Sequence, residues 1–280
     1  MRMWYNMFYI AKIVFWRIFS NMRMREYREA KQVLKSIEKE KSNFCTIHYS
    51  CEGFLDSGLI PRITSIAIVD FDTWQSQSFS LHISAQFLGI SLEEINKNLN
   101  KIEEDMLKRY FNFLKKNDKT KFIHWNMRSD TYGFGAIELR GYVLCPNDVY
   151  ILPNERKVDL PRLFTQLYGK KYIGHPQLTI LIEKNFNLPE AFMSGPDEVK
   201  AFTKNEFVKL HLSTSSKAKS LPKLLRKAID GNLKTDAKLI SKYGISPDGI
   251  ITMVRETWYL SLIFWLLSVI VAAFIGSILT

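Results

Sequence analysis

Cysteine is scarce in this sequence. The 280 residues include three cysteines, at positions 45, 51 and 145, and no two of them have the Cys-x-x-Cys spacing. This argues against a disulfide framework and a zinc site, and favours a cytosolic location for the soluble part of the chain. Hydrophobic residues nevertheless make up 46% of the chain, which is enough to build a core. An intrinsically disordered chain and a disulfide-stapled miniprotein are both excluded.

Acidic residues are outnumbered by basic ones. The 28 Asp and Glu residues face 39 Lys and Arg residues, which gives a formal net charge of +11 at pH 7. A basic protein of this kind favours a polyanionic partner, either nucleic acid or an anionic membrane surface. The charge does not distinguish between these two partners.

Charged residues are absent from the last segment, residues 257–280. The 22 residues Trp258 to Leu279 would form a helix of about 33 Å, long enough to cross a bilayer core. Upstream, residues 200–256 contain twelve Lys or Arg and five Asp or Glu. By the positive-inside rule we predict a single-pass protein of the inner (cell) membrane, with its large N-terminal part in the cytoplasm.

Small residues recur along this predicted transmembrane helix. Ser268, Ala272 and Gly276 are spaced by four, and Ser261 lies seven residues before Ser268 on nearly the same face. Such a stripe lets helices approach closely, so we expect a homo-oligomer in which these residues pack or line a narrow pore. The alternative is a helix that acts only as an anchor.

The N-terminal segment, residues 1–41, is predicted to be helical. Its first 20 residues are rich in aromatics but are interrupted by Arg2, Lys12 and Arg17, too often for an uncharged span. We expect an amphipathic helix on the inner leaflet or on a partner subunit, followed by a charged helix from residue 25 to residue 41.

Residues 42–212 alternate strand and helix patterns. Three strands in succession predict an antiparallel meander, and a Ser91–Glu94 capping box opens a long helix that continues to Phe113. The predicted strands are 44–50, 63–69, 76–83 and 121–125, and the later helices are 132–142, 159–168, 178–185 and 198–202. This order is that of a ribonuclease H-like α/β domain.

A connector is predicted between this domain and the membrane. The Ser- and Lys-rich residues 213–220 resemble a linker, and basic helices are expected at 221–229 and 234–243. Residues 213–256 would therefore form a basic helical connector, followed by the transmembrane helix at 257–280.

Four short motifs within residues 42–212 resemble those of the DnaQ-like (DEDD) 3'-5' exonucleases, and one of them, residues 158–164 (ValAspLeuProArgLeuPhe), resembles the family's AspThr-x-x-Leu segment. The first strand ends in Ser50-Cys51-Glu52, so Glu52 takes the Glu position of the family's Asp-x-Glu and Ser50 replaces the Asp. Residues 124–134, HisTrpAsnMetArgSerAspThrTyrGlyPhe, resemble the HisAsn-x-x-PheAsp motif with one extra residue before Asp130. Residues 194–202 resemble the closing helix, with Asp197 or Glu198 as its acid.

The resemblance implies a site that has lost its chemistry. Exonucleases of this class hold two Mg²⁺ ions with several carboxylates, and Ser50 supplies no charge. A degenerate set of Ser50, Glu52, Asp130 and Asp197 predicts no catalytic residue and no resident metal or other cofactor. A groove that binds nucleic acid by base stacking and basic contacts could survive. Its candidate residues are Glu52, His124, Trp125, Asn126, Arg128, Asp130, Tyr132, Phe134, Lys209 and His211.

Structural roles compete with these assignments. His124, Trp125 and Tyr132 could serve core packing alone, and Asp130 could cap the helix that follows it. The Asp-x-Asp pair at Asp70 is interpreted as a turn. Asp159 is interpreted as a helix cap.

The whole architecture resembles the HalB family, the membrane effectors of Hailong anti-phage defence. In that family, DNA oligomers made by a partner nucleotidyltransferase bind the exonuclease-like domains of an oligomer and keep a membrane channel closed. The resemblance implies an effector gated by single-stranded DNA oligomers. Two alternatives stay open: an active, Mg²⁺-dependent membrane-tethered 3'-5' exonuclease, and a membrane-anchored protein-docking adaptor.

Overall fold

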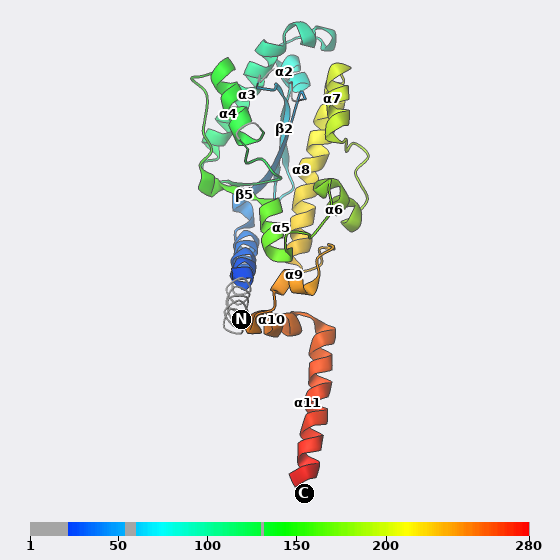
Figure 1. The fold of residues 1–280 in the computed structure, drawn as a ribbon. Coiled ribbons are helices and arrows are strands. Elements are labelled where there is room, and N and C mark those ends of the chain that lie inside the picture. Colours follow the sequence, from blue (N-terminus) through cyan, green and yellow to red (C-terminus); the bar gives the residue numbers. More distant parts are fainter. Residues whose placement is uncertain (1–21, 54–59, 130–131, 280) are drawn as a thin grey trace, which may run out of the picture. The chain divides into compact units, whose positions relative to one another are not determined.

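The computed structural model describes residues 22–53, 60–129 and 132–279. The chain divides into two compact units. The first, here the sheet unit, comprises Leu34–Leu163 and His175–Lys234. The second, here the helical unit, comprises Met1–Val33, Phe164–Gly174 and Thr235–Thr280. Each unit is described separately below, with element labels as in Figure 1.

The sheet unit is built on a mixed five-stranded sheet in the order β3-β2-β1-β4-β5. Strand β2 is antiparallel to both β1 and β3, which confirms the predicted meander. Strands β4 and β5 continue the sheet parallel to β1. The strands are β1 (Phe44–Cys51), β2 (Ile63–Asp70), β3 (Ser76–Ser80), β4 (Lys121–His124) and β5 (Lys157–Asp159).

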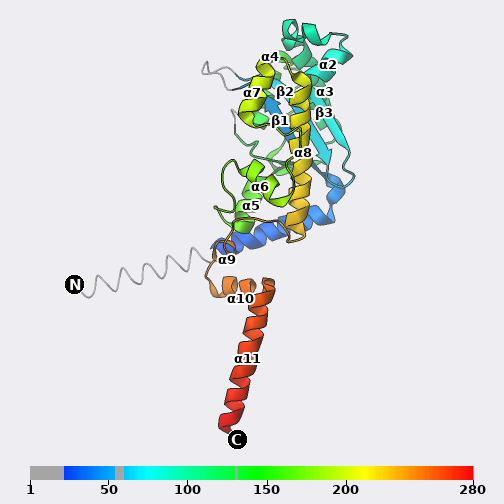
Figure 2. The same ribbon diagram turned by 90° about the vertical axis from the view of Figure 1, so that its right-hand side faces the viewer.

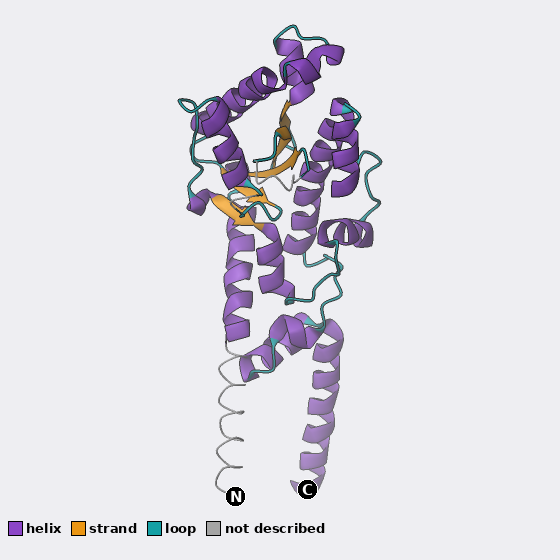
Figure 3. Cartoon of the chain, turned by 45° about the horizontal axis from the view of Figure 1, so that its top comes forward, coloured by secondary structure: helices purple, strands orange, loops and turns teal. Residues whose placement is uncertain are grey.

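Helices cover both faces of this sheet (Figures 1 and 3). Ile66 and Ile68 of β2 belong to a core cluster with α3, whereas Ala67 and Val69 pack with Ala218 of α8. Because alternate residues of a strand point to opposite faces, α3 and α8 lie on opposite sides. The helices of the sheet unit are α2 (Leu81–Phe87), α3 (Leu99–Lys116), α4 (Phe134–Leu144), α6 (Gln177–Asn185), α7 (Gly195–Thr203) and α8 (Phe207–Ile229), with short 3-10 helices at η1 (Lys41–Asn43), η2 (Leu92–Lys97) and η3 (Asn154–Arg156). Helix α5 (Leu160–Tyr168) begins in the sheet unit, and its residues from Phe164 onward belong to the helical unit.

The predicted linker at 213–220 is wrong, because these residues form the middle of α8. Their small side chains let the helix pack closely on the sheet: Ser213, Thr214 and Ala218 are fully buried. Pro222 lies within α8 and cannot donate the usual hydrogen bond to the carbonyl four residues earlier. The Thr46 hydroxyl of β1 donates to that carbonyl, of Ala218, at 3.0 Å. The strand thereby satisfies the group that the proline leaves without a partner.

Several predicted boundaries also change. The third strand ends at Ser80 and α2 follows, so residues 81–83 are helical, and the long helix is divided at Asn98 into η2 and α3. The helix predicted at 132–142 begins at Phe134 instead. Gly133 precedes it with φ 121°, where a Cβ would lie 2.3 Å from the Met127 backbone. Only glycine fits this close approach, and a regular helix cannot include it.

The helical unit gathers segments that are distant in sequence. It includes the start of a helix over residues 22–39, together with α9 (Leu239–Tyr243), α10 (Pro247–Glu256) and α11 (Trp258–Leu279). The Arg23 guanidinium donates hydrogen bonds to the carbonyls of Gln166, Leu167 and Ser241, and thereby joins three of these segments. The helix predicted at 234–243 is confined to α9, and residues 1–21 of the predicted N-terminal segment lie outside the described residues.

Helix α11 coincides with the uncharged segment predicted from the sequence. Among the described residues it is the one helix long and apolar enough to cross a membrane, over Trp258–Ile275, and none of that stretch is buried. The helix and the candidate span are therefore confirmed.

Candidate functional site

A buried polar cluster lies at the carboxyl end of β1, where the sequence predicts the degenerate site. We call it the Glu198 cluster; it consists of Ser50 from β1, Glu198 from α7, and Ser213, Thr214 and Lys217 from α8. One oxygen of Glu198 accepts hydrogen bonds from Ser50 at 3.1 Å and Ser213 at 2.7 Å, and it lies 2.7 Å from the Lys217 ammonium. The hydroxyls of Ser50 and Thr214 are 2.8 Å apart.

The alternation of β1 explains how this cluster forms. Ile47 and Tyr49 point into the core shared with α3, so Thr46, His48 and Ser50 point to the opposite face. This face is polar and is buried against α8, as the bonds of Thr46 to Ala218 and of Ser50 to Thr214 show.

Burial makes the Glu198–Lys217 ion pair the main electrostatic feature of the cluster. The side chains are 9% and 8% exposed, so each charge depends on the other for compensation. The neighbouring His48 is also buried, and burial, together with the Lys217 charge, lowers its pKa to about 3. His48 is therefore neutral at physiological pH, and the ammonium of Lys217 also lies over the Phe192 ring at 5.2 Å.

The donor set of this cluster does not fit a divalent metal. A metal bound to Glu198 would have to compete with an ammonium group 2.7 Å from the same oxygen. Its nearest partners on β1 and α8 are neutral hydroxyls, whereas Mg²⁺ prefers carboxylates and water. Within the described residues, no group of three His, Cys, Asp or Glu side chains could hold a metal ion. The predicted Asp130 lies outside the described residues.

The two acids of the closing helix have different roles. Asp197, the acid preferred from sequence, is exposed at the start of α7 and accepts a hydrogen bond from the Ser194 hydroxyl at 2.6 Å. That bond and the nearby Lys200 lower the pKa of Asp197. Ser194 is the N-cap of α7 and accepts the Asp197 N–H, so Asp197 lies in the exposed first turn and Glu198 is the acid that faces β1.

Glu52 belongs to a second network, just beyond the end of β1. Its carboxylate accepts the backbone N–H of Arg62 at 2.9 Å. Arg62 also bonds Glu103 at 2.6 Å, and Glu103 is fully buried and accepts two hydrogen bonds from Arg140, each of 2.8 Å. Glu52 is thus occupied by this carboxylate–arginine network.

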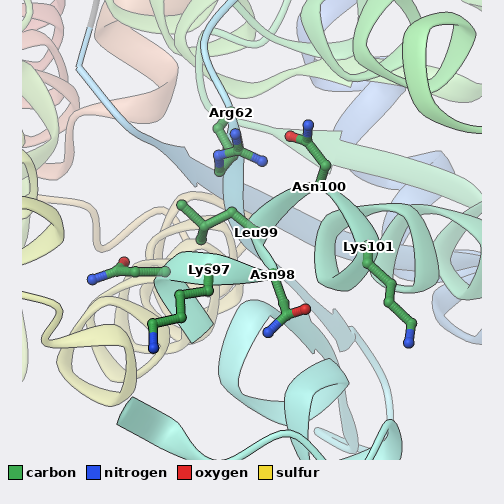
Figure 4. Close-up of a pocket in the computed structure, with 7 residues that line it drawn as sticks. Arg62, Lys97, Asn98, Leu99, Asn100 and Lys101 are labelled. Carbon is green, nitrogen blue, oxygen red and sulfur yellow. The ribbon is translucent and has the colours of Figure 1, made fainter. Parts of the chain in front are cut away.

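A pocket of about 380 Å³ opens beside this network (Figure 4). Its lining is polar and basic and consists of Arg62, Asn96, Lys97, Asn98, Leu99, Asn100 and Lys101. Lys97 and Lys101 are exposed, so the pocket presents positive charge to solvent. Anionic groups are the ligands that such a lining favours.

Three predicted groove residues are buried instead. His124 is 2% exposed and its Nδ1 accepts the Met127 N–H, while burial lowers its pKa to about 4. Trp125 is 8% exposed and Phe134 lies in the core. None of these rings offers an exposed face for base stacking in this conformation.

The other described members of the 124–134 motif lie at the surface or against Tyr49 of β1. Asn126 is exposed with φ 55°, and the exposed Arg128 forms an ion pair with Asp159 at 2.8 Å. Tyr132 stacks against Tyr49 of β1 at 4.9 Å, and its pKa is raised by burial and then by neighbours that include Glu198. Tyr132 therefore packs on the core side of β1, and Asn126 and Arg128 are exposed to solvent.

Lys209 and His211 lie on α8, before the cluster residues. Lys209 is exposed and bonds Glu206 at 2.6 Å. The rings of His211 and His82 are in contact, with centroids 5.0 Å apart. Burial, and then the electrostatic effect of His82, lower the pKa of His211 to about 4. Of the two, Lys209 is the one available as a phosphate contact.

Sequence reasoning missed Ser213, Thr214 and Lys217, because all three fall in or beside the assumed linker. Their signal was helical periodicity, since Thr214, Lys217, Ala218 and Leu221 recur at spacings of three and four. The competing interpretations of two aspartates are confirmed: Asp70 accepts the Thr73 N–H within a turn, and Asp159 accepts the Arg162 N–H at the start of α5.

The serines of α11 bond to backbone carbonyls. Ser268 donates to Phe264 at 2.7 Å, and Ser261 donates to Val254 of α10 at 2.6 Å. Ala272 is exposed and Gly276 lies within the helix. Helix packing or pore lining by these residues stays a prediction.

No family model, curated protein or solved structure matched this chain.

Proposed function

We propose that this chain is a membrane-anchored effector whose sheet unit is a catalytically inactive, exonuclease-like sensor of single-stranded DNA oligomers. The strand order β3-β2-β1-β4-β5, with β2 antiparallel to its neighbours, supports the ribonuclease H-like assignment. Fold alone does not give function, so the proposal depends on the site.

The observation that carries the proposal is the position of Lys217. The resemblance to DnaQ-like exonucleases places metal-binding carboxylates at the end of β1, and here Ser50 and the Glu198–Lys217 ion pair lie in that place. The ammonium is paired with Glu198 and does not bind and activate a water molecule as a metal ion does. Such a site does not favour hydrolysis of a strand, and because its two charges are buried and compensate each other, retention of the strand depends on the exposed cations of the same unit.

Exposed cations on the same unit supply contacts for the strand. Arg128 and Lys209 have side chains that are 60% and 62% exposed, and Lys97 and Lys101 line the basic pocket. Contacts between such side chains and phosphates provide most of the affinity for a nucleic acid of any sequence. The net charge of +11 is consistent with this partner.

The second part of the proposal concerns the membrane. Helix α11 would span the inner membrane once, and several copies would form a channel. DNA oligomers made by a partner nucleotidyltransferase would bind the sheet units and keep this channel closed. The uncharged, exposed surface of α11 supports the span.

The test uses the purified full-length chain with end-labelled single-stranded DNA oligomers, in Mg²⁺ and in EDTA. We expect retention on native gels and an intact strand on denaturing gels under both conditions. Shortening that requires Mg²⁺ would favour the exonuclease alternative. Failure to retain any strand would favour the docking adaptor.

A further inference from the structure

Helix α10 turns its polar side toward the protein. The backbone of Gly249 lies so close to Tyr243 that a Cβ would be 2.3 Å from the Tyr243 carbonyl oxygen. Glu256 accepts hydrogen bonds from the hydroxyls of Tyr27 and Tyr243. Asp248 forms an ion pair with Arg28 at 3.2 Å, so both acids of this helix are paired.

The apolar side of α10 faces away from the protein. Ile250 and Ile251 are 46% and 55% exposed, and Val254 continues their stripe at helical spacing. Ile240 and Ile245, from α9 and the turn before α10, are exposed as well. A surface helix in water normally has the opposite orientation, with apolar residues inward and polar residues outward.

This apolar face is continuous with the candidate membrane span. Helix α10 ends at Glu256, Thr257 is extended with φ −119° and ψ 102°, and α11 begins at Trp258. The Ser261 hydroxyl donates to the Val254 carbonyl, which fastens the first turn of α11 to the end of α10. Figures 1 and 2 both show α10 running across the direction of α11. If α11 crosses the bilayer, α10 lies along its surface.

We propose that the face formed by Ile250, Ile251 and Trp258 is buried in the boundary between lipid headgroups and acyl chains, with α10 as an interfacial helix. Trp258 is 77% exposed, and tryptophan is enriched at this depth of membranes. The exposed Arg255 lies three residues before the start of α11 and suits anionic headgroups. This inference rests on the proposed span of α11.

The test places spin labels on the full chain in lipid nanodiscs that contain anionic lipid, after replacement of the three native cysteines. Labels at Ile251→Cys, Leu267→Cys and Glu29→Cys report on the α10 face, the middle of α11 and a control position on the helix over 22–39. Collision with oxygen, which concentrates in lipid, and with a water-soluble nickel chelate measures the surroundings of each label.

We expect the Leu267 label to collide with oxygen only and the Glu29 label to collide with the nickel chelate. The Ile251 label should collide less often with nickel and more often with oxygen than the Glu29 label does. An Ile251 label as accessible to nickel as the Glu29 label would overturn the inference while the span stands. Loss of collisions with both reagents at Ile251 would mean that protein, such as a second copy, covers this face. A Leu267 label that collides with nickel would instead refute the span itself.

Discussion

Folded proteins usually bury apolar residues and expose polar ones, and two surfaces of this chain depart from that rule. The face of β1 toward α8 buries polar residues, and the outer face of α10 exposes apolar ones. The first buries His48, Ser50 and an ion pair, whereas the second exposes Ile250 and Ile251. Buried polar groups are tolerated where partners satisfy them, so the first surface depends on its internal bonds. Exposed apolar groups are tolerated where lipid replaces water, so the second depends on its surroundings. Substitutions should therefore act on folding stability at β1 and on membrane contact at α10.

The largest effect is expected at the buried ion pair. Lys217→Met leaves the Glu198 charge without compensation, and removal of one partner from a buried pair costs about 3 to 5 kcal/mol of unfolding free energy. Lys200→Met is the matched control, because Lys200 pairs with the adjacent but exposed Asp197. Its effect should be far smaller, since water screens exposed pairs. Chemical denaturation measures both, and equal losses would remove the distinction between the two acids.

Acidification should act through the buried histidine of the same face. The pKa of His48 is about 3 in the folded state, below its ordinary value, so the unfolded state binds the proton more readily. The resulting stability is fully present above about pH 6.5 and falls by about 1.4 kcal/mol per pH unit below it. The His48→Asn variant should lose this part of the pH dependence between pH 6 and pH 4, while His124 and His211, whose pKa values burial also lowers, keep theirs, as measured by denaturation at each pH. A slope identical to that of the unsubstituted chain would show that His48 is not held neutral.

A smaller effect is expected on DNA binding. Arg128→Gln removes an exposed cation, so the affinity for single-stranded DNA should fall. The slope of log K against the logarithm of the salt concentration should become shallower by about 0.7 for one lost phosphate contact. Lys116→Gln is a control with the same change of charge at an exposed position near the end of α3. Fluorescence anisotropy across a range of salt concentrations measures both. Equal effects of the two substitutions would indicate a general response to charge and would exclude Arg128 from the site.

The smallest change is expected from a bulky residue in the small-residue stripe of α11. Ser268→Leu should weaken oligomerisation in detergent because close helix approach needs a small side chain. Val269→Leu, on a neighbouring face, should leave assembly unchanged. Light scattering of the purified chain would report both, and an unaltered assembly for Ser268→Leu would remove the argument from the stripe.

The sequence allowed accurate prediction wherever one pattern dominated. Strands β1 and β2 and helix α11 lie within about a residue of their predicted ends, because apolar runs of strand length and an uncharged run of membrane length are strong signals. Strand β5 was missed because its three residues are too few to show alternation.

The polar cluster was harder to predict. Ser50 was placed correctly at the end of β1, but the partner of Glu198 was assigned to a linker, because serine and lysine are common in loops. The choice between Asp197 and Glu198 depends on which side of α7 meets the sheet, and adjacent residues on a helix differ by about 100° in direction. Which of two adjacent acids faces the sheet is decided by long-range packing, and a short sequence motif carries no information about that packing.

We expect the Lys217 ammonium to lie beside Glu198 where an active exonuclease would hold a metal ion, so that strand binding needs no Mg²⁺. The most direct measurement is the dissociation constant of the full-length chain for a single-stranded DNA oligomer, in Mg²⁺ and in EDTA at matched ionic strength. The same dissociation constant and an intact strand are expected in both conditions. Tighter binding or strand shortening that depends on Mg²⁺ would contradict this expectation.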